Sequence, residues 1–211
     1  NFLLNYPHYC YHVLNRPSIT IKLANTADSK ITFADKTSKW ITSKVSRKHV
    51  HQIRSNYDGI LIGKNTLNLD DPNLTVRVDG RKKNIIRLLL DTKLSIDTNS
   101  KITKNIRNNP LIIFTAKNLN LQKARYLISK GVKIYRVNKL SDGLLCVNSI
   151  LKILHCLNIK NILIEGGAKT ASSFLNSGYC DLMYIYKSSF FVGSKGLHSF
   201  DNLNKLSNFF L

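Results

Sequence analysis

The residues with the clearest potential for chemistry follow a short apolar segment in the last third of the chain. Glu165 comes directly after the strand-like run Asn161–Ile164, and two glycines and a helix-like segment beginning at Ala168 follow it. Glycines let the backbone approach a ligand, and the free N–H groups at a helix N-terminus attract phosphate. A tight connection without a ligand would have the same pattern, so the position of Glu165 at the end of the strand is what favours a site here.

Paired aspartates form a second pattern. Asp70 and Asp71 begin the segment Asp-Asp-Pro-Asn-Leu-Thr-Val-Arg, which ends at Arg77. Paired carboxylates can bind a metal or share a proton, whereas an Asp-Pro turn uses its side chains to cap the backbone. The turn is the more common use for at least one of the two, and both uses remain open from the sequence.

A third pattern places Lys22 in a strand-like segment and the only tryptophan, Trp40, in the polar segment 37–42. A strand lysine is usually solvated, and a lone tryptophan usually belongs to the core. Taken alone, the three patterns indicate an α/β enzyme that binds an anion, and they do not identify its reaction.

Short apolar runs alternate with amphipathic segments along the chain. We predict strands over 18–24, 59–63, 85–90, 111–115, 132–137, 161–164 and 183–188, and helices over 43–56, 121–129, 150–157 and 168–177. A polar turn is expected over 68–73, and the first helix should have Thr42 or Ser43 as its N-cap. The buried face of that helix should comprise Val45, His49, Val50 and Ile53. This alternation predicts a parallel or mixed sheet covered by helices on both faces, with ligands at the carboxyl ends of its strands.

The chain is strongly basic, with 32 lysines and arginines, 12 acidic residues and a net charge of +20. Such a charge is expected of a nucleic-acid-binding module, of a protein that attracts small polyanions, or of a composition biased toward lysine and asparagine. The basic residues are spread along the whole chain, which favours the last explanation and predicts no specific nucleic-acid partner.

No apolar run is long enough for a membrane span, and the N-terminus has no signal-peptide pattern, so we expect a cytoplasmic protein without a membrane partner. The four cysteines are Cys10, Cys146, Cys156 and Cys180. They are scattered without metal-ligand spacing, and we therefore expect buried thiols in a reducing compartment and no metal site.

Seven blocks, taken in their order and spacing, resemble the reductase domain of bacterial bifunctional riboflavin-biosynthesis deaminase/reductases. They are RPSITIKLANTAD (16–28), SKWIT (38–42), IRSNYDGILIGKNT (53–66), DDPNLTVR (70–77), IRLLLDT (86–92), ILIEGGAKTASSFL (162–175) and FFVGSKGL (190–197). The similarity extends from Arg16 to about Phe210. It implies a dihydrofolate-reductase-like α/β fold, with a mostly parallel mixed sheet and helices on both faces.

The resemblance also implies a role for each matching residue. Positions that match the family's NADPH site are Ala24, Trp40, Thr66, Asp70, Thr92, Gly167, Ala168, Lys169, Thr170, Ala171, Ser172 and Ser173. Positions that match its substrate site are Ser38, Arg54, Leu74, Arg77 and Glu165. Glu165 and Lys22 are the candidates for orienting and protonating the ribose, and we treat them as the catalytic pair.

The implied reaction is the NADPH-dependent reduction of 5-amino-6-(5-phosphoribosylamino)uracil to 5-amino-6-(5-phosphoribitylamino)uracil. The ribose would open as a Schiff base and receive hydride at C1′, while the protein holds both reactants in line. The forked donors of Arg54 and Arg77 suit the substrate's phosphate, and the helix start at Gly167 suits the cofactor's pyrophosphate. The resemblance also implies a homodimer.

Two departures from the family pattern affect the expected structure. The family has Asp-Gly where this chain has Asp28-Ser29, and glycine makes such a turn more easily. Residues 1–15 resemble the connector that follows a deaminase domain in these multifunctional enzymes, and 16–211 resemble a reductase domain without its last strand. We therefore expect the chain itself to lack deaminase activity, and either one edge of its sheet to be exposed or its dimer interface to be incomplete.

Three alternative functions remain open from the sequence. The chain could be another reductase of the same fold, such as a dihydrofolate-type reductase, although Arg54 and the block at 70–77 favour a phosphorylated pyrimidine. It could be a basic nucleic-acid-binding domain, which would be retained on duplex DNA with a steep salt dependence. It could also be an inactive remnant that keeps the reductase fold.

Overall fold

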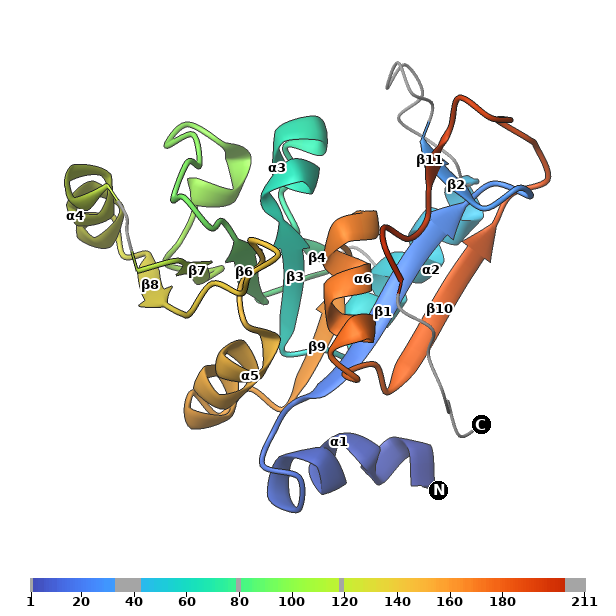
Figure 1. Cartoon of the computed structure of the whole chain (residues 1–211). Coiled ribbons are helices and arrows are strands. Elements are labelled where there is room, and N and C mark those ends of the chain that lie inside the picture. Colours follow the sequence, from blue (N-terminus) through green and yellow to red (C-terminus); the bar gives the residue numbers. More distant parts are fainter. Residues whose placement is uncertain (1, 33–42, 79–80, 118–119, 204–211) are drawn as a thin grey trace.

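Every strand pair in the main sheet is parallel. The computed structural model describes residues 2–32, 43–78, 81–117 and 120–203, and its seven-stranded sheet has the order β10-β1-β9-β3-β6-β7-β8 (Figure 1). These strands are β1 (Ser18–Asn25), β3 (Gly59–Gly63), β6 (Ile86–Leu90), β7 (Leu111–Thr115), β8 (Lys133–Arg136), β9 (Asn161–Ile164) and β10 (Leu182–Lys187). Because all pairs are parallel, the carboxyl ends of the seven strands lie at one edge.

Helices connect most of the strands in the described part of the chain. They are α1 (Phe2–His12), α2 (Lys44–Arg54), α3 (Lys64–Asp70), α4 (Leu121–Ser129), α5 (Val147–Cys156), α6 (Ala168–Asn176) and the short 3₁₀ helix Lys101–Thr103. Two antiparallel ribbons lie outside the main sheet: β2 (Lys30–Thr32) pairs with β11 (Leu197–His198), and β4 (Val76–Val78) pairs with β5 (Arg81–Lys83).

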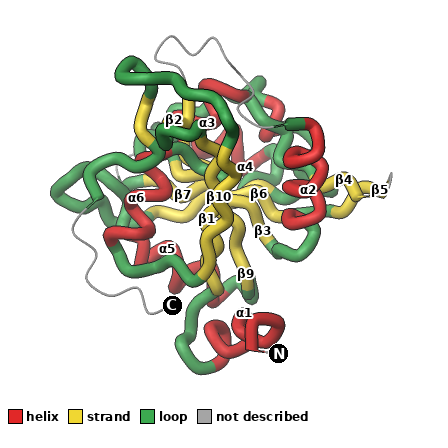
Figure 2. The backbone as a smooth tube through the Cα atoms, turned by 90° about the vertical axis from the view of Figure 1, so that its right-hand side faces the viewer, coloured by secondary structure: helices red, strands yellow, loops and turns green. Residues whose placement is uncertain are grey.

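Side chains along the central strands point alternately to the two faces of the sheet, and each face has its own hydrophobic core. In β3, Ile60 and Ile62 belong to a cluster with Leu127 of α4, whereas Leu61 belongs to a second cluster with Phe174 of α6. The period of two in a strand turns neighbouring side chains to opposite faces. Helices therefore cover both faces, with α5 and α6 on one side of the strands and α2 on the other (Figure 2). The predicted α/β architecture is confirmed.

The seven predicted strands and four predicted helices are all present, with ends shifted by a few residues. The largest shift is in α5, which begins at Val147 and not at position 150. The turn predicted over 68–73 is wrong in its first half, because 68–70 form the last residues of α3. This helix ends at Asp71, which has a left-handed φ of 37° and precedes Pro72.

The N-terminus of α2 agrees with the prediction in its cap but not in its buried face. Ser43 is the N-cap, and its side chain accepts a hydrogen bond from the N–H of Ser46. Val50 and Ile53 are buried, but Val45 is 78% exposed. His49 is exposed as well. The buried stripe of this helix therefore begins one turn later than its sequence predicts.

Residues 1–15, predicted to be a connector, contain the helix α1. The carboxylate of Asp181 holds the segment that follows α1, because Arg16 donates two hydrogen bonds of 2.7 Å to it and the N–H of Ile19 donates another. The hydroxyl of Tyr6 in α1 donates a fourth, of 3.1 Å. The sequence of 1–15 has no clean helical period, which is why no helix is predicted there. Its contacts with a residue far along the chain cannot be read from that sequence.

No helix in the described residues is long and apolar enough to cross a membrane. The four cysteines are free thiols, and the prediction that all are buried is wrong. Cys10 is buried, Cys146 and Cys180 are half-buried, and Cys156 is exposed at the last residue of α5.

The turn after β1 joins the sheet to the β2–β11 ribbon. Ser29 has a φ of 60°, the left-handed conformation for which the resemblance expects glycine. The Asp28 carboxylate accepts hydrogen bonds from the Thr26 hydroxyl at 2.5 Å and from the N–H groups of Val192 and Gly193. These bonds, chiefly the one from Thr26, lower the pKa of Asp28 to about 2. The ionised carboxylate therefore ties the turn to the segment that leads into β11.

Replacing Ser29 with glycine should relieve the strain in this turn. We expect Ser29→Gly to raise the free energy of unfolding by about 0.5–1 kcal/mol, because the steric cost of a left-handed side chain exceeds the extra entropy that glycine loses on folding. Ser29→Ala is the control and should give no gain, since it keeps the β-carbon. Urea unfolding of the three proteins measures the difference, and an equal stability of the glycine and alanine variants would contradict the strain.

Candidate active site

Two strand ends and one helix meet closely at the base of the site. β3 ends at Gly63, Gly166 follows β9, and Thr170 of α6 packs against both. A β-carbon at Gly63 would collide with Thr170 Oγ1, and one at Gly166 would lie 2.5 Å from Thr170 Cβ. Glycine is therefore needed at both positions for α6 to start this close to the sheet.

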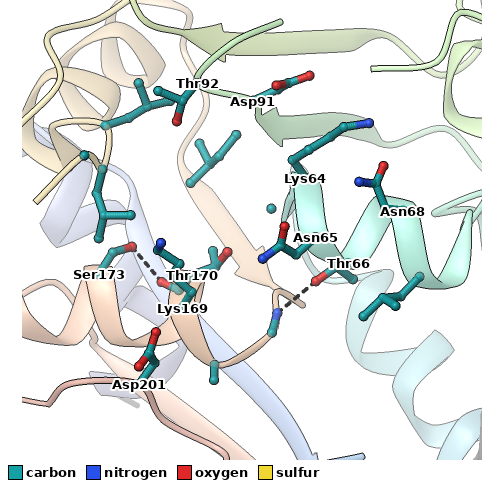
Figure 3. A pocket seen from close by; sticks show the side chains of 18 of the residues that line it. Lys64, Asn65, Thr66, Asn68, Asp91, Thr92, Lys169, Thr170, Ser173 and Asp201 are labelled. Carbon is teal, nitrogen blue, oxygen red and sulfur yellow. Dashed lines mark hydrogen bonds between the residues drawn. The ribbon is translucent and has the colours of Figure 1, made fainter. Parts of the chain in front are cut away.

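The amino end of α6 is open to a ligand. Gly167 is its N-cap residue, and no described side chain caps the helix there. The N–H of Gly167 itself donates to Thr66 Oγ1 at 2.9 Å, which links the amino end of α6 to α3 (Figure 3). The free amides of the first turn and the helix dipole together suit an anion such as a phosphate.

A cavity of about 1030 Å³ lies above these strand ends (Figure 3). The predicted cofactor residues among those lining it are Thr66, Thr92, Gly167, Ala168, Lys169, Thr170 and Ser173. Residues that line it without having been predicted include Lys64, Asn65, Asn68, Asp91, Lys93, Ser95, Lys139, Leu144, Leu145, Leu197, His198, Phe200 and Asp201. Lys64 and Asp91 directly follow strands, so the expectation that ligands bind at the carboxyl ends of strands could have identified them. The lining residues in and after β11 reach the cavity only through tertiary contacts.

The other predicted cofactor residues that the structure describes do not line the cavity. Ala171 is fully buried in the core, and Ser172 is buried with its hydroxyl accepting the N–H of Asp201. Asp70 is exposed, and Ala24 lies half-buried on β1 outside the cavity lining. Trp40 falls outside the described residues. Contact of these five with a cofactor stays a prediction.

Apolar side chains line the cavity near both of its ends, beside ionisable ones such as His198 and Lys139. At one end Ile31, Leu197 and Phe200 come from the β2–β11 ribbon and the residues after it. At the other end Leu90 of β6 meets Leu144 and Leu145 of the segment after β8. Between these ends lie the amino end of α6 and the hydroxyls and amides of α3. Figure 1 shows the ribbon beyond β1 and the 139–145 segment on the β6 side.

The loop after β6 is a fixed wall of the cavity. The Asp91 carboxylate is buried and accepts hydrogen bonds from Ser95 Oγ at 3.1 Å and from the N–H of Ile96 at 2.7 Å. The carbonyl of Thr92 accepts bonds from Thr115 Oγ1 and from the N–H of Ala116. The carboxylate of Asp91 is thus used to shape the loop that presents Thr92.

A buried ion pair lies at the other side of the β9–α6 connection. Arg54 of α2 donates from Nε to Glu165 Oε1 at 2.5 Å and from Nη2 to Oε2 at 2.8 Å. Its Nη1 donates to the carbonyl of Thr75 at 3.3 Å. The side chains of Arg54 and Glu165 are only 16% and 8% exposed. The fork of Arg54, expected to bind the substrate's phosphate, is therefore engaged by Glu165 in this structure.

The ion pair keeps Glu165 ionised. Burial, the largest single influence, opposes its charge, but the charge and hydrogen bonds of Arg54, helped by Lys22 and His51, outweigh it and lower the pKa of Glu165. The pKa of His51 is lowered by burial and by Arg54, despite the opposite effect of Glu165. A carboxylate held in this way is a poor proton donor at neutral pH, which argues against that part of the expected role.

Lys22 lies on the face of β1 opposite the core residues Ile21 and Leu23. Its ammonium sits 5.8 Å from the ring centre of Tyr186, and the Tyr186 hydroxyl lies 2.9 Å from Nδ1 of His49. The charge of Lys22 contributes to the lowered pKa of Glu165, so the two residues of the predicted catalytic pair interact electrostatically. Tyr186 and His51 were not predicted, and neither follows a strand or belongs to a motif that would have marked it.

The other predicted substrate residues are dispersed. Leu74 is buried in the core with a left-handed φ of 49°, and Arg77 is exposed on β4. Ser38 falls outside the described residues. Among the described residues, no cluster of three or more histidine, cysteine or acidic side chains is arranged to hold a metal ion.

Known proteins are similar to this chain over most of its length. The riboflavin biosynthesis protein RibD of Aquifex aeolicus is 37% identical over 183 residues, which cover 87% of this chain and 49% of that protein. The 2,5-diamino-6-ribosylamino-4(3H)-pyrimidinone 5′-phosphate reductase of the same organism is 25% identical over 202 residues, covering 92% of this chain and 88% of that protein. This chain therefore spans about half the length of the RibD relative.

A solved structure agrees with these relatives. The crystal structure of the diaminohydroxyphosphoribosylaminopyrimidine deaminase/5-amino-6-(5-phosphoribosylamino)uracil reductase of Thermotoga maritima superposes with a TM-score of 0.77 and 31% identity, covering 98% of this chain and 54% of that one. The dihydrofolate-reductase-like fold implied by the resemblance is confirmed. The family model described as RibD C-terminal domain matches residues 17–209, and the chain belongs to that family.

Proposed function

We propose that this chain is an NADPH-dependent reductase of riboflavin biosynthesis, which converts 5-amino-6-(5-phosphoribosylamino)uracil to its ribitylamino product. The observation that carries the proposal is the connection between β9 and α6. Only Gly166 separates the ionised Glu165 from Gly167 at the open amino end of α6. A charged group for the substrate and an anion site for a cofactor are thereby adjacent. Membership of the RibD C-terminal domain family and the name of the Aquifex reductase support the same reaction.

The cavity fits a dinucleotide better than a single ring compound. A dinucleotide has two flat ring systems joined by a pyrophosphate, and apolar side chains line the cavity on both sides of the amino end of α6. Lys64, Lys93 and Lys169 line it, whereas the Asp91 carboxylate is engaged by its own loop. This positive lining favours NADPH over NADH, which lacks the 2′-phosphate. When bound, the reduced nicotinamide supplies the hydride.

Glu165 and Lys22 have separate roles in the opening of the ribose. When the C1′–O4′ bond breaks, the exocyclic nitrogen forms a C=N bond to C1′ and becomes positively charged. The ionised Glu165 stabilises this charge electrostatically, since it is buried and already fixed by Arg54. Lys22 carries the proton that the ring oxygen O4′ requires. Hydride addition at C1′ then neutralises the nitrogen and completes the ribitylamino group.

The two arginines have different parts in this proposal. Arg77 is exposed on β4, and its charge acts on His51 beside the ion pair, so it is available for the substrate's phosphate. Arg54 uses its Nε–Nη2 edge on Glu165, which leaves only its remaining N–H groups for that phosphate. We therefore assign orientation of Glu165 to Arg54 as its main role and phosphate binding to Arg77.

A homodimer is part of the proposal. β10 is an edge strand and pairs only with β1 among the described strands. Leu182 and Ile185 of β10 are exposed, and Phe191 beyond it is 74% exposed. An unpaired edge with apolar side chains is normally covered, and a second copy of the chain is the occupant we expect.

The reaction is tested by NADPH binding followed by single-turnover oxidation. With the deaminated ribosylamino-pyrimidine phosphate, the nicotinamide absorbance should fall for the wild type. Glu165→Gln should slow this step by about 100-fold or more while the Kd for NADPH changes little, because the lost charge acts on the ribose and not on the cofactor. Unchanged turnover would remove Glu165 from the mechanism.

Controls separate the competing functions in the same assay. Dihydrofolate should give no oxidation, and turnover with it would favour a dihydrofolate-type reductase. NADPH binding without oxidation by either substrate would favour another substrate or an inactive remnant. Failure to bind any nicotinamide nucleotide would contradict the cofactor.

The role of Arg54 is tested by the pH dependence of kcat/KM. Because Arg54 lowers the pKa of Glu165, the wild type should keep its activity as the pH falls, until Glu165 is protonated below the usual range of a glutamate. Arg54→Gln raises that pKa, so activity should be lost at a higher pH. Arg77→Gln is the matched control and should raise KM about tenfold without moving the acid limb. An unmoved limb in Arg54→Gln would make Arg54 a phosphate ligand only.

The dimer is tested by sedimentation equilibrium. The wild type should have twice the mass of the chain, and Ile185→Lys should shift it toward the monomer because a charge would be buried at the edge strand. A monomeric wild type, or a variant that dimerises equally well, would contradict this interface.

A further inference from the structure

Tyr186 of β10 makes two contacts that the proposed mechanism does not use. Its hydroxyl lies 2.9 Å from Nδ1 of His49 in α2, and the two rings meet edge to face with their centres 5.9 Å apart. The Lys22 ammonium lies over its ring, 5.8 Å from the centre. Tyr186 therefore connects α2 to the lysine that carries the proton in the proposed reaction.

The strand register shows which of two neighbouring rings meets the ammonium. Lys22 is paired with Tyr184 in the β1–β10 register, and Tyr186 is paired with Ala24, two residues farther toward the carboxyl ends. Two residues of a strand rise about 6.6 Å. The ring that meets the Lys22 ammonium is thus not its register partner but the tyrosine nearer the carboxyl edge of the sheet. Glu165 follows β9 at that same edge.

The hydrogen bond to His49 restricts the ring. A tyrosine side chain can change its rotamer unless its far end is held. The bond between the hydroxyl and Nδ1 ties that end to α2, the helix that also supplies Arg54 to the ion pair with Glu165. Burial, Tyr184 and the charge of Glu165 raise the pKa of Tyr186, so its hydroxyl stays protonated at neutral pH. One side chain of α2 thus fixes the carboxylate, and another fixes the ring under the ammonium.

We propose that Tyr186 is a positioning residue of the reaction, whose ring holds the Lys22 ammonium at the carboxyl edge of the sheet while His49 holds the ring. The inference rests on the proposed reductase function and on the role of Lys22 in protonating O4′. A cation over an aromatic face is attracted by the negative charge of that face. A lysine side chain loses rotamer entropy when it is held in one place, and this attraction offsets part of the loss. Tyr186 itself neither gives nor takes a proton in this role.

The role is tested by the single-turnover rate of NADPH oxidation at saturating substrate. Tyr186→Leu removes the ring and should slow this rate about tenfold, because the ammonium is no longer held. The Kd for NADPH and the half-saturating substrate concentration should change little, since the ring acts on the lysine and not on the ligands. Tyr186→Phe keeps the ring and should retain most of the rate. Tyr184→Leu is the matched control, because it removes the neighbouring ring on the same face of β10 and should leave the rate unchanged.

A second substitution separates positioning from support of the fold. Lys22→Met removes the ammonium, so the additional change Tyr186→Leu should not slow the remaining reaction further. A ring that only supports the sheet would slow the reaction equally in both backgrounds, and that outcome would overturn the positioning role. A wild type that binds NADPH and substrate without oxidation would instead overturn the proposed function, and this role with it.

The contact also has a spectroscopic signature that needs no turnover. In protein labelled with ¹³C at the lysine Cε, the ring current of Tyr186 should shift the Lys22 methylene signal upfield, and that signal is identified by its absence from Lys22→Met. Tyr186→Phe should keep the shift, Tyr186→Leu should abolish it, and His49→Ala should reduce it because the ring is no longer held. An unshifted signal in the wild type, or a shift that persists in Tyr186→Leu, would overturn the inference even where Lys22→Met reacts too slowly to follow.

Discussion

The parallel pairing of all seven strands is the constraint on which the rest of the structure depends. Parallel strands put every carboxyl end at one edge, so residues that follow β3, β6 and β9 meet there although they are far apart in the chain. Gly63 and Gly166 then allow Thr170 to pack against two strand ends, which brings the amino end of α6 to that edge. A side chain at either glycine would collide with Thr170, so Thr170 or the start of α6 would have to move away from the strand ends.

The ion pair between Arg54 and Glu165 determines the charge at the candidate site. Burial alone would favour a neutral carboxyl group, but the charge and hydrogen bonds of Arg54 outweigh it and lower the pKa of Glu165. The bidentate geometry keeps the charge and fixes its direction, since both oxygens accept a hydrogen bond from the same planar guanidinium. The negative charge is therefore fixed in place by the protein's own side chains, as the proposed stabilisation of a positively charged intermediate requires.

Two carboxylates outside the reacting centre shape the walls of the cavity. Asp91 uses both oxygens to hold the loop after β6, and Asp28 uses its charge to tie the turn after β1 to the segment before β11. Each is satisfied by hydrogen bonds from its own surroundings, so each carboxylate fixes a loop through its acceptor oxygens.

The sequence by itself determined the α/β class, the seven main strands and the glycine connection at 165–167, because these depend on local periodicity and on residues adjacent in the chain. The tertiary structure alone decided that Arg54 meets Glu165, since 111 residues separate them and no local pattern encodes their pairing. It likewise decided that the helix at 2–12 contacts Asp181 through Tyr6, and that Leu144 and His198 line the same cavity as the amino end of α6. Local patterns encode which residues turn inward and where strands end, whereas the partner that each side chain meets depends on how distant elements pack.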